Sequence, residues 1–156
     1  MPSLIRTGPS TSDKDTRRST SGGIVMMAGG PVNWISKLQP IVAVSSMEAE
    51  YIACFFVLQD VVWIQQLLKD LGLGRTQPTL VHIDSRSARQ LAENPVHHQR
   101  SKHIDIKFHW IRDMVADGTV QLVHVPSEDQ RSDFLTKSLR GDVFCRHVRA
   151  VVMGGS

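Results

Sequence analysis

The sequence predicts an α/β domain with a mixed β-sheet, and three patterns lead to this fold class. Residues 24–28 and 32–36 are short β-type runs separated by a Gly-Gly-Pro turn, which favours a hairpin. A long, mostly apolar segment follows and has the length of a helix. The compact apolar run 79–83 and the alternating run 120–125 are typical of strands and are separated by helical segments. This order predicts antiparallel pairing early in the chain and parallel crossovers later.

Length and composition narrow the class of protein. The 156 residues fit one domain, and a content of 41% hydrophobic and 21% charged residues is typical of a globular chain. Two cysteines, Cys54 and Cys145, exclude a disulfide framework and favour an intracellular location. The most apolar run, residues 51–58, is shorter than the roughly 18 residues of a membrane span, so no membrane partner is expected. A net charge of +3 permits a nucleic-acid partner without establishing one.

The long helix has clear start and stop signals. Ser45 and Glu48 have the spacing of a capping box, in which Ser45 is the N-cap and Glu48 the third helical residue. The helix is expected to run to about Leu71, because Gly72 and Gly74 then end it. Its middle is apolar nearly all round, so we expect it to be largely buried.

Shorter elements are expected elsewhere. Residues 41–44 form an extended piece before the long helix, and residues 87–92 and 104–115 have helical spacing. A second capping-box spacing at residue 127 opens a last helix that runs to about residue 139. The tryptophans are expected in the core and the clustered histidines at the surface or in packing roles: Trp34, Trp63 and Trp110, and His97, His98, His103 and His109.

Composition also divides the chain into three parts. Residues 1–12 are interpreted as a loose terminal segment, in which only residues 3–6 could form a strand. Residues 13–139 hold the folded domain. Residues 140–156 are a basic tail to which the sequence gives no role.

Three acids lie where a cation site could be assembled from separate elements. Glu50 is one turn into the long helix, Asp84 follows the buried strand at its carboxyl end, and Asp133 is in the second turn of the expected last helix. Mg²⁺ prefers oxygen ligands of this kind, and two such ions about 3.5–4 Å apart can drive phosphodiester cleavage.

Each acid also has an ordinary structural explanation. Glu50 could be a solvated helix residue, and Asp84 could cap the helix that follows it. Asp133 could pair at the surface with Lys137, one turn further along the chain. Glu48, the other acid of the long helix, already serves as the partner of the N-cap. Taken singly, none of these acids specifies a metal site.

Ordered sequence motifs provide more specific evidence. They are Asp15-Thr16-Arg17-Arg18-Ser19-Thr20-Ser21-Gly22, Trp34-Ile35-Ser36-Lys37-Leu38-Gln39-Pro40, Ser45-Ser46-Met47-Glu48-Ala49-Glu50-Tyr51-Ile52-Ala53, Asp84-Ser85-Arg86-Ser87-Ala88, Asn94-Pro95, Arg100-Ser101-Lys102-His103-Ile104-Asp105-Ile106 and Val125-Pro126-Ser127-Glu128-Asp129-Gln130-Arg131-Ser132-Asp133-Phe134-Leu135-Thr136-Lys137. In this order they resemble the ribonuclease H domain of copia-type LTR retrotransposon Pol polyproteins. The resemblance covers residues 13–139.

The resemblance implies a ribonuclease H-like fold, with a mixed five-stranded sheet flanked by helices. It further implies metal-dependent hydrolysis of the RNA strand of RNA–DNA hybrids during reverse transcription. The family's acids fall on Glu50, Asp84 and Asp133, with two Mg²⁺ or Mn²⁺ ions. Glu50 and Asp84 would hold one ion, and Asp133 would help to hold the other. The expected partners are the hybrid and the reverse transcriptase domain of the same polyprotein, in a cytoplasmic virus-like particle or the nucleus.

One departure from the family pattern concerns its first acid. In the family this Asp lies on the central first strand and bridges both ions, whereas residues 1–12 contain no acid. Asp13 and Asp15 fall in the following loop and are not natural replacements. We therefore expect an N-terminally incomplete domain whose first, central strand is missing or replaced, with residues 4–7 as one possible replacement. Its activity is expected to be weak or absent.

Contacts with a hybrid would come from basic and small polar residues, each of which could equally belong to an ordinary solvated surface. The candidates are Lys37, Ser85, Arg86, Arg100, Lys102 and Lys107. The alternative function is a non-catalytic relic or co-opted module that binds nucleic acid or a protein partner. A third possibility is a fragment without a stable fold.

Overall fold

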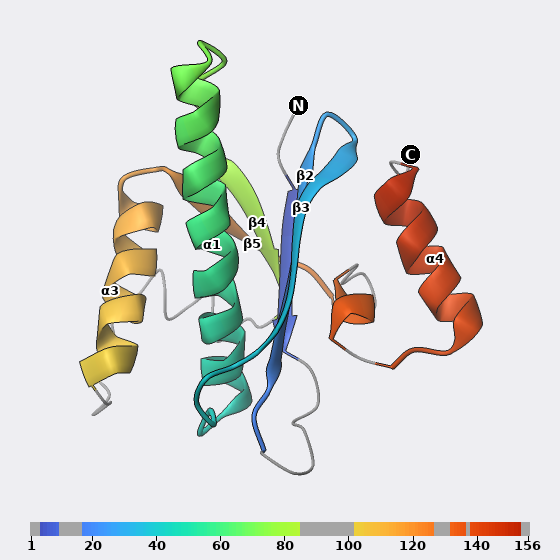
Figure 1. Ribbon diagram of the computed structural model, residues 1–156. Coiled ribbons are helices and arrows are strands. Elements are labelled where there is room, and N and C mark those ends of the chain that lie inside the picture. The colour runs from blue at the N-terminus through green and yellow to red at the C-terminus, as the bar shows by residue number, and fades with distance from the viewer. Residues whose placement is uncertain (1–3, 10–16, 85–101, 127–131, 137, 154–156) are drawn as a thin grey trace.

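The computed structural model describes residues 4–9, 17–84, 102–126, 132–136 and 138–153. Its core is a five-stranded sheet with the order β3-β2-β1-β4-β5 (Figure 1). The strands are β1 (Leu4–Pro9), β2 (Thr20–Met27), β3 (Gly30–Leu38), β4 (Thr79–Ile83) and β5 (Val120–His124). The first three pair antiparallel, whereas β4 and β5 join in parallel. The predicted mixed five-stranded sheet is confirmed.

The central strand β1 is supplied by the N-terminal segment. Thr7 pairs with Gly23 of β2 on one side and with Ile83 of β4 on the other. This differs from the expectation that residues 1–12 are loose, because Leu4–Pro9 hydrogen-bonds to both neighbours and fills the gap between them. The first strand is therefore replaced rather than missing, and its sequence LIRTGP contains no acid.

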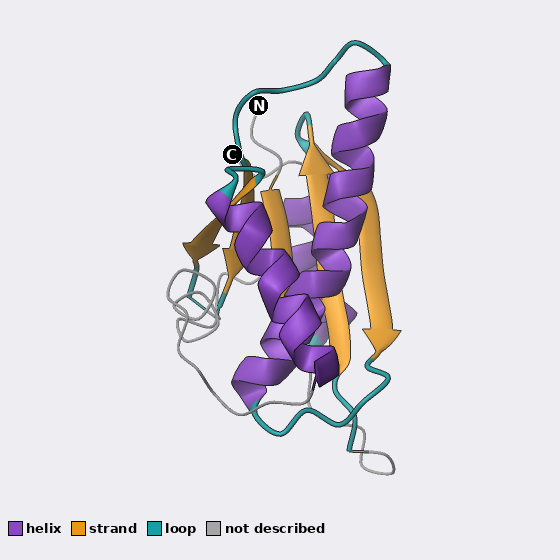
Figure 2. Ribbon diagram, turned by 90° about the vertical axis from the view of Figure 1, so that its left-hand side faces the viewer, coloured by secondary structure: helices purple, strands orange, loops and turns teal. Residues whose placement is uncertain are grey.

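Helices cover both faces of the sheet. In Figure 1, α1 (Ser46–Asp70) and α3 (Lys102–Ala116) lie on one face, and η2 (Asp133–Leu135) and α4 (Gly141–Val152) lie on the other. Figure 2 views the molecule from the side of α1 and α3, which stand in front of the strands. The result is a three-layer arrangement with the sheet in the middle.

Helix α1 begins and ends where its signals predict. Ser45 is the N-cap, and its Oγ accepts a hydrogen bond from Glu48 N at 3.1 Å. The Glu48 carboxylate accepts from Val44 N at 2.7 Å, one residue before the usual capping-box partner. Leu71 is the C-cap, and Gly72 follows with φ +74°, which favours glycine. By length and composition α1 could cross a membrane, but it is the main core helix of this domain.

The two faces of the sheet bury different amounts of side chain. On the face of α1 and α3, the buried cluster contains Val25, Tyr51, Cys54, Val57, Leu58, Val61, Val81, Ile83, Phe108, Ile111, Val120 and Leu122. On the opposite face, the buried cluster is Ile24, Met26 and Val151, with Phe134 and Leu135 packed against it. Odd and even residues of β2 point to opposite faces, as strand geometry requires.

Several elements differ from the prediction. Residues 41–44 form no strand, and the expected last helix over 127–139 is replaced in the described residues 132–136 by the short 3₁₀ helix η2. The tail forms α4, because an apolar stripe ending in Val151 gives it a face to bury. The expected helix at 87–92 lies outside the described residues.

The tryptophans also differ from the prediction. Trp34 and Trp63 are each 64% exposed, so the expectation that they lie in the core is wrong, whereas Trp110 packs against it. Trp34 is on the edge strand β3, and Trp63 is on the outer side of α1, where no described element covers it.

Candidate active site at the carboxyl end of β4

Glu50 is held on the buried side of α1. It lies one turn after the N-cap, and it is 5% exposed. The alternative that Glu50 is a solvated helix residue is therefore excluded. The next residue, Tyr51, stacks on Phe108 of α3 with ring centroids 3.8 Å apart, and this contact fixes the start of α1 against its neighbour.

A buried glutamine fastens the start of α1 to the sheet. Gln39 is fully buried, and its Nε2 donates to Ser21 Oγ of β2 at 3.0 Å and to Ala49 O of α1 at 2.8 Å. Its backbone N donates to Ser19 O at 2.8 Å. Because Ala49 precedes Glu50, these bonds fix the height of Glu50 relative to β2.

Asp84 directly follows the last residue of β4. Ile83 of β4 pairs with Thr7 of β1, and Ile83 O accepts from Val125 N at 2.9 Å. These bonds place Asp84 at the carboxyl end of two parallel strands, where α/β sheets commonly hold their sites. Asp84 is half-buried. The prediction that Asp84 caps a following helix concerns residues that lie outside the described part of the chain.

Asp133 approaches from the opposite face of the sheet. It is the first residue of η2 rather than part of a longer helix. The turn fits against β2 because Gly22 has no side chain: a Cβ there would collide with Thr136 Cγ2 and lie 3.3 Å from Leu135 Cβ. Ser36 of β3 adds a hydrogen bond to Leu135 O at 2.6 Å. Gly22 and Ser36 therefore position Asp133.

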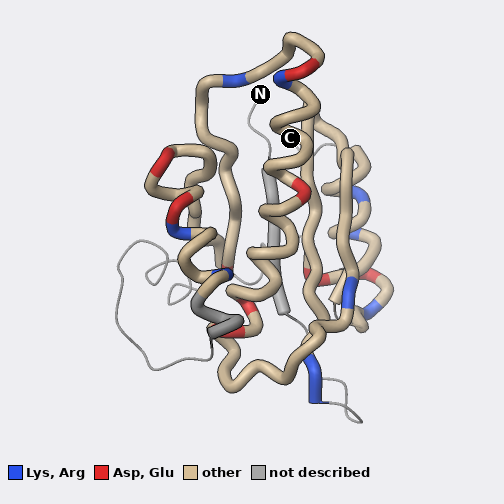
Figure 3. The backbone as a smooth tube through the Cα atoms, turned by 60° about the vertical axis from the view of Figure 1, so that its left-hand side comes forward, with Lys and Arg blue, Asp and Glu red and all other residues tan. Residues whose placement is uncertain are grey.

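The strand register brings the three acids to one end of the sheet. Gly22, beside η2, pairs with Gly8 of β1, and the adjacent Thr7 pairs with Ile83, next to Asp84. Neighbouring strands are about 4.8 Å apart, so β2 and β4 are separated by about 10 Å across β1. One carboxylate oxygen of each acid is buried: Glu50 Oε2, Asp84 Oδ1 and Asp133 Oδ1. Figure 3 marks the acidic positions along the backbone in red.

The described residues do not complete a metal centre by themselves. Among them, no group of three or more His, Cys, Asp or Glu side chains lies close enough to hold a metal ion. The acids share a region of the molecule without forming a joint ligand set. Their assignment as catalytic and metal-binding residues stays a prediction.

The charge of Glu50 acts on a cysteine of the same helix. Cys54, one turn further along, is fully buried, and its pKa is raised from 9.0 to about 12, first by desolvation and second by the charge of Glu50. The Cys54 thiol therefore stays protonated and unreactive at neutral pH.

The candidate nucleic-acid contacts are only partly visible. Lys37 is exposed on β3, with its Nζ 5.5 Å from the centroid of the Phe56 ring. Ser85, Arg86 and Arg100, and the side chain of Lys102, lie outside the described residues. The predictions for these four residues stay untested.

Sequence reasoning missed the residues that position the acids. Gln39, Gly22 and Ser36 give no local signal, because each acts on a segment far away in the chain. The only available sign is that all three lie inside the two upstream motifs of the resemblance.

A pocket lies away from the acids. It has a volume of ≈ 590 Å³ and is lined by the C-terminal half of α1 and by Thr79 and Thr119, at the N-terminal ends of β4 and β5. Gln65 bridges Thr79 Oγ1 and Thr119 O there. This pocket is at the other end of the sheet from Asp84 and does not belong to the candidate site.

Sequence comparison links the chain to transposon polyproteins. It is 40% identical over 125 residues to the retrovirus-related Pol polyprotein from transposon TNT 1-94 of Nicotiana tabacum, covering 80% of this chain. It is 42% identical over 132 residues to that from transposon RE1 of Arabidopsis thaliana, covering 85%. The chain spans only 9% of the length of each of these relatives. No family model matches the sequence.

Solved structures identify the fold. LC11-RNase H1, isolated from compost, superposes with a TM-score of 0.63 at 20% identity, over 86% of this chain and 92% of that one. The same enzyme in complex with an RNA/DNA hybrid gives 0.60 at 18% identity, over 85% and 92%. The foamy viral protease-reverse transcriptase in complex with an RNA/DNA hybrid gives 0.58 at 14% identity, over 98% of this chain and 20% of that one.

The fold places this chain among the RNase H-fold domains. Together with the sequence identities, the fold confirms the resemblance drawn from the motifs. The chain is homologous to one segment of the retrovirus-related Pol polyproteins of plant transposons, and that segment has an RNase H-like fold.

Proposed function

We propose that this domain hydrolyses the RNA strand of RNA–DNA hybrids during reverse transcription, with an activity weakened by the composition of β1. The observation that carries the proposal is the placement of Glu50, Asp84 and Asp133 at one end of an RNase H-fold sheet. The named relatives and the hybrid-bound neighbours support it. The partners we propose are the hybrid and the reverse transcriptase domain of the same polyprotein.

The cofactor we propose is a divalent cation, Mg²⁺ or Mn²⁺. The type of donor fits, because a buried carboxylate oxygen on each acid is a ligand that hard cations prefer. The number of donors does not fit two ions, because β1 carries no acid. In addition, the described residues contain no group of three or more His, Cys, Asp or Glu side chains that could hold a metal ion. Glu50 and Asp84 would hold one ion, which leaves Asp133 alone for a second. When bound, such an ion supplies an activated water and charge stabilisation.

Cleavage of an end-labelled hybrid with Mg²⁺ tests the proposal. We expect slow cleavage that Glu50→Gln and Asp84→Asn abolish. Thr7→Asp should raise the rate, because it adds an acid to the central strand at the residue whose backbone pairs with Ile83, the neighbour of Asp84 in the chain. If cleavage proceeds unchanged in both the Glu50→Gln and Asp84→Asn variants, the site is wrongly assigned.

The absence of an acid in β1 also favours a second function, a non-catalytic module that binds hybrids. In that case the chain would bind a hybrid with the same affinity in Mg²⁺ and in EDTA, and Asp133→Asn would leave binding unchanged. Neither the native chain nor the Thr7→Asp variant would cleave. Cleavage by the native chain that is lost in Glu50→Gln and Asp84→Asn would exclude this alternative.

A further inference from the structure

Two lysines from separate elements gather at one aromatic ring on the outer side of α1. Lys37 of β3 has its Nζ 5.5 Å from the centroid of the Phe56 ring. Lys107 of α3 has its Nζ 5.6 Å from the same centroid and 5.5 Å from that of Phe55. We call Lys37, Phe55, Phe56 and Lys107 the lysine–phenylalanine cluster. Aromatic faces attract cations, which explains how the side chains are held in place.

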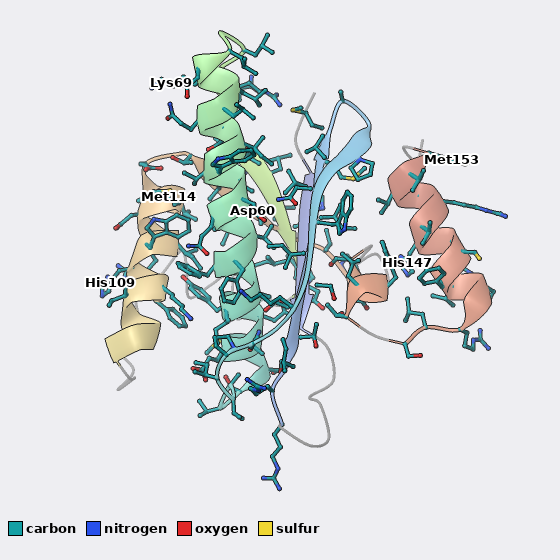
Figure 4. The ribbon with its side chains drawn as sticks, in the orientation of Figure 1. Asp60, Lys69, His109, Met114, His147 and Met153 are labelled. Carbon is teal, nitrogen blue, oxygen red and sulfur yellow. The ribbon has the colours of Figure 1, made fainter. Side chains whose placement is uncertain are left out.

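Within the described residues, no ion pair neutralises the charges of the cluster. Both Nζ atoms lie within 5.6 Å of one centroid, so the two ammonium groups are at most about 11 Å apart. This upper limit is close to the Debye length, which is about 10 Å at 0.1 M salt. Neither lysine forms an ion pair within the described part of the chain. Asp60, one turn beyond Phe56 on α1 (Figure 4), is not paired with either of them. Two close, uncompensated cations favour an anionic ligand.

The cluster lies near the candidate active site. In the sheet, Lys37 pairs with Ser21 of β2. The Gln39 side chain donates hydrogen bonds to Ser21 and to the start of α1, and so connects the two. Phe56 is six residues beyond Glu50, which corresponds to about 9 Å along the helix axis.

We propose that Lys37 and Lys107 together bind a backbone phosphate of the nucleic acid. This inference rests on the proposed function and adds a binding subsite to it. Lys107 contributes to the subsite because α3 packs beside α1, as the stacking of Tyr51 on Phe108 shows. The phenylalanine rings preorganise the two amines without consuming their charge.

The salt dependence of hybrid binding in EDTA tests the proposal. For a labelled RNA–DNA hybrid, each lost phosphate contact lowers the slope of log K against log salt concentration by about 1. We expect that decrease for Lys37→Gln and for Lys107→Gln, and wild-type slopes for Lys37→Arg and Lys107→Arg. Lys69→Gln is the matched control, because Lys69 is an exposed lysine near the far end of α1 (Figure 4). The slope for Lys69→Gln should stay close to the wild-type slope, because this variant changes the net charge without removing a phosphate contact.

The outcomes separate this proposal from the function on which it rests. If the wild-type chain binds no hybrid, both are overturned. If it binds and the Lys37→Gln/Lys107→Gln double variant keeps the wild-type slope, only the subsite is overturned. A lower melting temperature with an unchanged slope would show that the lysines merely pack on the rings. Phe56→Leu should weaken binding by less than the double variant, because the charges remain.

Discussion

The two faces of the sheet hold the acids by very different means. Among the described residues, the α1 face buries a cluster of twelve, and five of these lie in the same helix as Glu50. The opposite face buries three, and Asp133 is held by a turn of three residues that fits over Gly22. Glu50 therefore cannot move without unfolding the core, whereas Asp133 can be displaced locally. The site combines one acid fixed by folding with one fixed by a few contacts.

Truncating one buried side chain on each face should reveal the largest difference between the two faces in the free energy of unfolding. Leu58→Ala removes a fully buried side chain and should lower the free energy of unfolding by about 2–5 kcal/mol. Val151→Ala on the other face removes two methyl groups and should cost only about 1–2 kcal/mol. Denaturant unfolding of both variants measures the difference. Equal losses would mean that the two faces are equally important to stability.

Gly22→Ala should displace the turn that carries Asp133. The new methyl group would collide with Thr136, and overpacking of this kind costs about 1–3 kcal/mol. Hydrogen exchange should rise in η2 and not in α1. The matched control is Gly30→Ala, because a Cβ at Gly30 meets nothing within 4 Å. If η2 stays protected in Gly22→Ala, the fit over Gly22 does not position Asp133.

Much of the fold could be predicted because its signals are local. Ser45 and Gly72 lie beside the ends of α1, and the run at Thr79–Ile83 is long and apolar enough to identify a strand. The central strand β1 was predicted only as one possibility, residues 4–7, because its pairing depends on partners that lie far along the chain and not on its own sequence. The same reason explains η2, whose short turn is set by contact with β2 rather than by its capping-box spacing.

The candidate site was predictable in its acids and not in its support. Glu50, Asp84 and Asp133 belong to recognisable motifs, and the register of β1 brings their elements together. The glutamine that fastens α1 gives no periodic or capping signal, because its partners are 18 and 10 residues away. Long-range hydrogen bonds of this kind become visible only in three dimensions.

Gln39→Leu should loosen the start of α1 without emptying the core. It removes the bonds to Ser21 and Ala49 from a buried position, and an unsatisfied buried partner costs about 1–3 kcal/mol. Gln66→Leu is the control, because Gln66 donates only to the exposed Asp70 at 2.7 Å, a contact worth a few tenths of a kcal/mol. Chemical denaturation compares the two. If Gln39→Leu lowers the free energy of unfolding no more than Gln66→Leu does, the hydrogen bonds of Gln39 do not hold the start of α1 in place.

Alkaline pH should destabilise the α1 face through Cys54. Its pKa is about 12 in the folded chain against an ordinary 9.0, so the stabilising contribution is complete below pH 9 and is lost as pH rises towards 12. Over that window the free energy of unfolding should fall by about 1.4 kcal/mol per pH unit more in the wild type than in Cys54→Ala. Unfolding curves at pH 8, 9 and 10 measure this difference. Parallel pH profiles for the two proteins would contradict the raised pKa.

The charge of Glu50 should be detectable in the same titration as the smallest effect. Desolvation is the main cause of the raised pKa of Cys54, and Glu50 is the second. Glu50→Gln should therefore lower that pKa while leaving it above 9.0, because burial remains. Thiolate absorbance against pH measures the shift, with the exposed Cys145 replaced by serine to leave one thiol. An unchanged pKa would mean that Glu50 is not charged beside Cys54, and a neutral Glu50 would be a poor ligand for the divalent cation proposed above.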